Sequence, residues 1–350
     1  MLQFCLDCRR AGSTGSWIIG TGVGMVLLVV VAIYFGTSAT DQRVAESTDP
    51  QANHFEKLEA VQQKLQAAIA NHRDVAWLIP EARSLVREQP DGTDARLCLA
   101  QIFMLSNRHF EAYEQLSETL ELKPGQAEVQ DLAGTVAMEL DQLVLAEKHY
   151  ALAVAAAPVE ARFRVHLAQA QMMQEKSADA RQTLRECLNV DSSLHVTRAM
   201  LSELDAHQGN LEAAIEQIRR ALELTPSKKR RTRLTYTLRH AQLLLQVDQP
   251  AQGLVVLQAL PLEERFDDQV MRQMAACWQE LGQPDRAARQ YESSLILRPT
   301  DDSAAAHSAR WYLEADDLAA AQRMVDLLHQ INPRSVELPK LLERLRAREK

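Results

Sequence analysis

The sequence predicts an all-α protein, a solenoid of about seven to eight helix pairs preceded by one transmembrane helix. Three observations support this prediction. A run of 19 mostly apolar residues occupies positions 17–35. Beyond it, amphipathic helical patterns recur with a period of about 34 residues. The low content of Gly, Pro and aromatic residues also argues against a sheet-rich fold.

The N-terminal apolar segment has the length of a membrane span. Residues 17–35 carry no charge, and a helix of this length just crosses a hydrocarbon core of roughly 30 Å. Arg9 and Arg10 precede the segment, whereas acidic residues dominate the stretch behind it. The positive-inside pattern therefore predicts a single-pass protein with a short cytoplasmic tail, residues 1–16, and a periplasmic or otherwise extracytoplasmic remainder.

Two further hypotheses concern this N-terminal region. Residues 37–39 resemble a signal-peptide cleavage site, but the apolar run is longer than a signal peptide usually has, and cleavage would also export the rest of the chain. Gly20 and Gly24 form a G-x-x-x-G motif, whose small residues allow close helix packing and a homodimer. Cys5 and Cys8 form a lone C-x-x-C without the other ligands of a zinc site.

A small, polar stretch connects the apolar segment to the helical region. Residues 36–54 have the composition of a flexible linker. The predicted solenoid covers residues 55–335, and residues 336–350 form an amphipathic segment predicted to cap its end. Prolines that fit the repeat spacing within the solenoid are Pro90, Pro124, Pro158, Pro226, Pro299 and Pro333.

Small and large residues recur at fixed offsets within each copy of the repeat. The clearest copy, residues 127–160, has Gly134 in its first half, then Ala146 and Tyr150, and Pro158 near its end. Small residues let helices approach closely, large ones fill the space between them, and proline ends the second helix. Further copies span residues 93–126, 161–194, 195–228, 268–301 and 302–335, with weaker ones at 59–92 and after 228.

This pattern resembles the tetratricopeptide repeat (TPR), and the resemblance covers roughly residues 59–335. It implies a right-handed superhelix whose inner groove is lined by the first helix of each repeat and binds polypeptides. The implied groove residues are Met138, Arg162, His166, Gln169, Met172, Met173, Met200, Glu203, His207, Arg239, Gln242, Arg272, Gln273, His307 and Arg310.

The chemistry of these side chains indicates the kind of ligand. Methionines adapt to varied partners, although membership of the core is an equal alternative for them. Arg239, Arg272 and Arg310 favour an acidic segment, because guanidinium groups pair well with carboxylates. The Lys and Asn residues with which some family members clamp a C-terminal carboxylate are not reproduced, so that class of ligand is not expected.

About five extra residues interrupt the period after Pro226, and this insertion is basic. It contains Lys228, Lys229, Arg230, Arg231 and Arg233. One interpretation is a solvated loop or an elongated first helix. The other is a docking patch for an acidic partner or for anionic lipid headgroups.

Composition and motifs favour a binding protein over an enzyme. The net charge of -8 is not that of a nucleic-acid-binding protein. The sequence has no phosphate-binding loop, zinc motif or nucleophile motif, so no cofactor or metal is expected. The leading hypothesis is a membrane-anchored scaffold or assembly factor of the cell envelope that binds proteins or peptides. A homo-oligomeric structural component and, with inverted topology, a cytoplasm-facing adaptor are the alternatives.

Overall fold

The computed structural model describes residues 50–265 and 267–348, and every regular element in them is a helix. The all-α prediction is therefore confirmed for this part of the chain. The predicted cytoplasmic tail, the transmembrane helix and both N-terminal motifs lie outside the described residues and stay predictions. None of the described helices combines the length and apolarity needed to cross a membrane. The chain divides into two compact units, with the boundary between Ser192 and Ser193.

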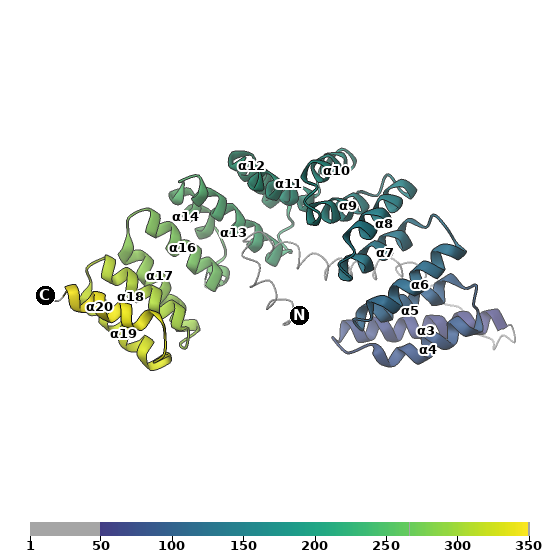
Figure 1. Cartoon of the computed structure of the whole chain (residues 1–350), viewed down its shortest axis with the longest axis horizontal. Coiled ribbons are helices and arrows are strands. Elements are labelled where there is room, and N and C mark those ends of the chain that lie inside the picture. Colours follow the sequence, from purple (N-terminus) through teal and green to yellow (C-terminus); the bar gives the residue numbers. More distant parts are fainter. Residues whose placement is uncertain (1–49, 266, 349–350) are drawn as a thin grey trace. The chain divides into compact units, whose positions relative to one another are not determined.

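The first unit contains four helix pairs, which follow one another in sequence order (Figure 1). A short turn joins the two helices of each regular pair, so they run antiparallel and pack against each other. The elements are α3 (Pro50–Ala70), the 3-10 helix η1 (Ala76–Leu78), α4 (Ile79–Glu88), α5 (Thr93–Leu105), α6 (His109–Leu122), α7 (Ala127–Glu139), α8 (Leu143–Ala156), α9 (Ala161–Met173) and α10 (Ser177–Val190).

The second unit also contains four helix pairs, together with a short helix and a closing helix. Its first and last pairs are regular, whereas the second pair contains the predicted insertion. The elements are α11 (His195–His207), α12 (Leu211–Leu224), α13 (Arg230–Gln246), α14 (Pro250–Gln258), α15 (Leu262–Arg265), α16 (Asp268–Glu280), α17 (Pro284–Leu297), α18 (Asp302–Glu314), α19 (Leu318–Ile331) and α20 (Glu337–Arg348).

The first helix pair begins earlier than the sequence indicated. Helix α3 starts at Pro50, inside the predicted linker 36–54, and is 21 residues long. Proline is well tolerated in the first turn of a helix, where its missing N–H is not needed. His54, Leu58 and Val61 are buried at helical spacing, so the apolar stripe of α3 extends into this polar-looking stretch.

A residue with a left-handed backbone ends the first helix of each pair. From the second pair onwards these residues are Asn107, Asp141, Glu175, Gly209, Asp248, Gly282 and Asp316. After α5, the Arg108 amide donates to the Phe103 carbonyl at 2.8 Å and the Asn107 amide to the Met104 carbonyl at 3.1 Å. This hydrogen-bond pattern caps a helix C-terminus. Successive turns keep the spacing of the repeat, except that the interval from Gly209 to Asp248 is longer than the others.

The five extra residues are therefore present, and four of them lengthen a helix. Helix α13 has 17 residues, whereas the first helices α11 and α16 have 13. The second helix of the same pair, α14, has 9 residues instead of the 14 of α12. The insertion thus forms an elongated first helix, and this leaves the docking-patch interpretation a prediction.

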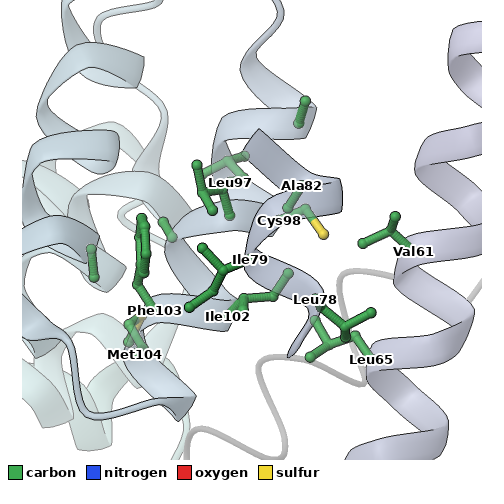
Figure 2. Close-up of a cluster of buried hydrophobic side chains, with 14 of the residues drawn as sticks. Val61, Leu65, Leu78, Ile79, Ala82, Leu97, Cys98, Ile102, Phe103 and Met104 are labelled. Carbon is green, nitrogen blue, oxygen red and sulfur yellow. The ribbon is translucent and has the colours of Figure 1, made fainter. Parts of the chain in front are cut away.

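The apolar core runs between the helices of each pair and its neighbours. Figure 2 shows part of it in the first unit, where Leu65 of α3, Leu78 of η1 and Ile102 of α5 belong to one cluster. Elsewhere a small residue lets two helices approach closely. A Cβ atom added at Gly134 of α7 would lie 2.7 Å from two ring carbons of Tyr150 on α8.

Helix α20 packs against the last helix pair. Leu338, Leu341 and Leu345 are buried in a cluster with side chains of α18 and α19. On the polar side of α20, the Arg344 guanidinium pairs with the Glu314 carboxylate at 2.5 Å. The amphipathic pattern of the C-terminal segment therefore corresponds to a capping helix.

Candidate functional site

The predicted groove methionines of the first unit differ in exposure. Met138 of α7 packs against the cluster that contains Tyr150, so it belongs to the core. Met172 of α9 is half-buried, as is Gln169 on the same helix. Met173 is the most exposed of the three methionines, with 38 % of its surface accessible. Among the predicted groove methionines of the first unit, the core alternative therefore holds for Met138.

Two predicted groove residues of the first unit, Arg162 and His166, have partners within the protein. Arg162 of α9 forms an ion pair with Glu128 of α7 at 3.4 Å. The imidazole of His166 is buried, with its Nδ1 atom 2.6 Å from an Asp131 carboxylate oxygen. Sequence reasoning did not single out Asp131. Asp131 lies 35 residues before His166, which is one repeat and one residue. This spacing could have identified Asp131, because residues so spaced face each other on neighbouring first helices.

The first five predicted residues of the second unit, on α11 and α13, differ in burial. Met200 and Glu203 of α11 are 7 % and 4 % exposed. Burial raises the pKa of the Glu203 carboxyl, and the charge of Arg239 opposes that rise. Arg239 also donates a hydrogen bond to the Gln242 side-chain oxygen at 3.1 Å. His207 is the one exposed residue among these five, which are Met200, Glu203, His207, Arg239 and Gln242.

Helices α16, α17 and α18 bring three of the predicted residues together. The imidazole of His307 on α18 stacks on the Tyr291 ring of α17, with centroids 5.0 Å apart and an interplanar angle of 20°. Partial burial lowers the pKa of His307, and the positive charges of Arg310 and Arg272 lower it further. Both guanidinium groups therefore act electrostatically on the stacked pair.

This region contains several arginine side chains. Asp268 is the ion-pair partner of two arginines, Arg272 and, at 3.3 Å, Arg298. The Arg272 and Arg298 side chains remain 51 % and 61 % exposed, and Arg310 is also exposed. Nearby on α16, the buried side-chain oxygen of Gln273 accepts no hydrogen bond from the described residues. We name Arg272, Tyr291, Arg298, His307 and Arg310 the α16–α18 site.

Two residues of the basic insertion make contacts within the folded protein. Arg233 donates to the carbonyls of Leu222 and Thr225 at 3.1 and 2.9 Å, which satisfies the C-terminal end of α12. Lys229 lies 3.2 Å from the Nε2 atom of His195. These two side chains are therefore occupied by contacts inside the second unit.

The other basic residues of the insertion lie at the surface. Arg230 is 3.5 Å from Glu263, and both side chains are largely exposed. Lys228 and Arg231 are exposed as well. Three of the five basic residues are therefore exposed, and the docking patch stays a prediction.

The described cysteines do not form a reactive site. Burial raises the pKa of the Cys98 thiol to about 12 and that of Cys277 to about 11. Such thiols stay protonated and are poor nucleophiles. Within residues 50–265 and 267–348, no cluster of three His, Cys, Asp or Glu side chains could hold a metal ion.

Comparison with known proteins identifies the fold. No protein-family model matches the sequence, and no curated protein is significantly similar to it. The C-terminal part of a TPR repeat-containing protein from Cytophaga hutchinsonii is similar in structure, with 14 % identity, 69 % of this chain and 98 % of that chain covered, and a TM-score of 0.59. A tetratricopeptide repeat protein from Parabacteroides merdae has 13 % identity, with 68 % and 92 % covered and a TM-score of 0.50. The chain therefore has the tetratricopeptide-repeat fold.

Proposed function

We propose that this chain is a scaffold that binds segments of other polypeptides on the first helices of its repeats. The α16–α18 site supports the proposal, because it exposes arginine side chains near the imidazole of His307, which stacks on the buried ring of Tyr291. Arginine is enriched where proteins bind partners. The proposal involves no catalytic step.

The proposed scaffold is anchored in a membrane through residues 17–35 and acts on the non-cytoplasmic side. The length and apolarity of this segment support the anchor. Arg9 and Arg10 ahead of it support the orientation. Protease digestion of intact cells and of spheroplasts tests the orientation: cleavage of the repeats only after the inner membrane is opened would favour a cytoplasm-facing adaptor.

Site-specific photocrosslinking tests the scaffold proposal. A photoreactive residue is placed at Arg272 on α16 or at Met172 on α9, in the full chain and in its native cells. The matched control is Glu216 on the second helix α12, an exposed side chain whose partners are Arg219 and Arg220. We expect the first-helix positions to capture a defined polypeptide, identified by mass spectrometry, that the control does not capture.

Two outcomes would contradict this proposal. Equal capture at Glu216 would show that the first helices have no special role. Capture of a second copy of the same chain, and of nothing else, would favour a homo-oligomeric structural component.

A further inference from the structure

Residues 127–173 and residues 268–314 form two segments with the same helix lengths and the same spacing between helices. We call this shared arrangement the frame. Helices α7, α8 and α9 have the same lengths as α16, α17 and α18, and the bounds of all three coincide when Ala127 is aligned with Asp268. Side chains can therefore be compared position by position between the two segments. One segment lies in the first unit and the other in the second.

Both segments carry a tyrosine and a histidine at equivalent positions. Tyr150 and His166 have ring centroids 5.5 Å apart, and Tyr291 and His307 have centroids 5.0 Å apart. Each tyrosine comes from a second helix, and each histidine comes from the next first helix. Both segments therefore bring a tyrosine and a histidine ring together, although the first pair is tilted by 49° and the second is stacked at 20°.

The residue that faces the histidine differs between the two segments. In the first segment Asp131 accepts a hydrogen bond from His166, and its carboxylate is buried. In the second segment, Arg272 occupies the position equivalent to Asp131. Arg310 occupies the position equivalent to Gln169. The first histidine therefore has a carboxylate of its own chain, whereas the second faces two cations.

The negative charges near His307 do not replace that carboxylate. Asp268 on α16 is already shared by Arg272 and Arg298. Asp301 and Glu337 act on His307 only through weaker electrostatic effects than the two arginines. His307 of the second segment therefore lacks the adjacent carboxylate that His166 has in the first segment.

We propose that the α16–α18 site binds an acidic side chain of a partner peptide. The partner's carboxylate pairs with Arg272 and Arg310 and accepts a hydrogen bond from His307, the role that Asp131 has toward His166. Guanidinium groups suit this task because their paired N–H donors match the two oxygens of a carboxylate. The inference rests on the proposed function and adds the chemistry of the ligand.

Peptide binding to the full chain tests this inference. The probe is a fluorescent hexaglutamate peptide, blocked at both ends so that only side-chain carboxylates are present, and hexaglutamine is its neutral counterpart. Fluorescence anisotropy measures the affinity. We expect hexaglutamate to bind more tightly than hexaglutamine and to lose affinity as salt is added.

Charge-matched variants locate the binding. Replacing Arg272 and Arg310 together by Gln should weaken hexaglutamate binding about 20-fold, since a surface arginine–carboxylate pair contributes roughly a factor of five. The control replaces Arg289 on α17 and Arg323 on α19 by Gln, two exposed arginines on second helices. It should change the affinity less than twofold, and circular dichroism verifies that both variants are folded.

A further variant supplies the carboxylate internally. Arg272→Asp places at this position the side chain that Asp131 has in the first segment. We expect it to abolish hexaglutamate binding and to raise the pKa of His307, measured from its ring resonances by NMR. An unchanged or lower pKa would contradict the proposed equivalence.

The outcomes separate this inference from the scaffold proposal. If the wild type does not prefer hexaglutamate, or if the Arg272/Arg310 variant binds it as the control does, the site does not take acidic side chains. Photocrosslinking at Arg272 could still capture a non-acidic partner, and the scaffold proposal would stand. If hexaglutamate binding depends on both arginines but no polypeptide is captured in cells, the scaffold proposal fails instead.

Discussion

At the level of single residues, buried histidines make the stability of this fold depend on pH. Burial lowers the pKa of His149, His195 and His240, and for His195 the value falls to about 4. Neighbouring positive charge adds to the effect, and for His195 that charge is Lys229. An unfolded chain, where histidine has a pKa of about 6.5, therefore binds protons before the folded chain does.

Replacing His195 should weaken the response to acid. Because its folded pKa is lower than its unfolded pKa, the free energy of unfolding falls as the pH drops from about 6.5 to 4, by roughly 1.4 kcal/mol per pH unit for one such group. His195→Gln removes this titration, and we expect a smaller loss of stability across that range. Urea unfolding at pH 7 and pH 5 measures it.

The control for this prediction is His207→Gln, because His207 is exposed. It should leave the pH dependence unchanged. If both variants behave like the wild type, protonation of His195 does not contribute to acid sensitivity.

Gly134 is required by the close approach of α7 and α8. In Gly134→Ala the new Cβ atom would lie 2.7 Å from ring carbons of Tyr150, so the ring must move within a packed core. We expect a loss of about 1–3 kcal/mol in the free energy of unfolding, measured with urea. Glu139→Ala, at an exposed position of the same helix, is the control and should change stability by less than about 0.5 kcal/mol.

The repeat as such does not forbid alanine at this position. The equivalent residue of the second segment is Ala275, which is buried in the cluster with Tyr291. A fully stable Gly134→Ala variant would therefore mean that α7 and α8 can adopt the spacing that α16 and α17 already have.

At the level of helices, neighbouring residues of the basic insertion have different roles. Arg233 satisfies carbonyls at the end of α12, where the helix dipole also favours a positive charge. Its neighbour Arg231 is exposed. One stretch of sequence thus contains a structural arginine and a surface arginine two positions apart.

The two arginines give a matched comparison. Arg233→Met should destabilise the last turn of α12 by about 1 kcal/mol, because two carbonyls lose their donor. Hydrogen exchange of amides at the end of α12 measures this local effect. Arg231→Met should leave that exchange unchanged, and equal effects of both variants would show that Arg233 acts through net charge alone.

Helix bounds were predictable wherever the repeat was regular. Proline and small residues at fixed offsets indicate where helices end and where they touch, so the pairs from α5 to α12 and from α16 to α19 match the predicted copies. The start of α3 was missed because residues 50–54 are polar in composition, although His54 is buried. The partner of His166 was missed because pairing depends on the register between neighbouring first helices.

At the scale of the whole molecule, the proposed anchor determines where the repeats act. A deletion of residues 1–40 should move the protein from the membrane fraction to the soluble fraction, because the apolar segment 17–35 is removed with them. Cell fractionation followed by carbonate extraction measures this. A variant with Gly20 and Gly24 replaced by Ile keeps the apolar length and should stay in the membrane. Recovery of the full chain in the soluble fraction would contradict the anchor.

The shared frame of residues 127–173 and 268–314 has a consequence for engineering. The two segments have equal lengths and matching helix bounds, so they can be exchanged as cassettes without changing the phase of the repeats around them. Such a chimaera would carry Asp131 and its neighbours into the second unit as one block. An exchange with a boundary inside the elongated helix α13 would instead shift that phase by the length of the insertion. Exchange of repeats therefore keeps their phase only where the boundaries lie outside α13.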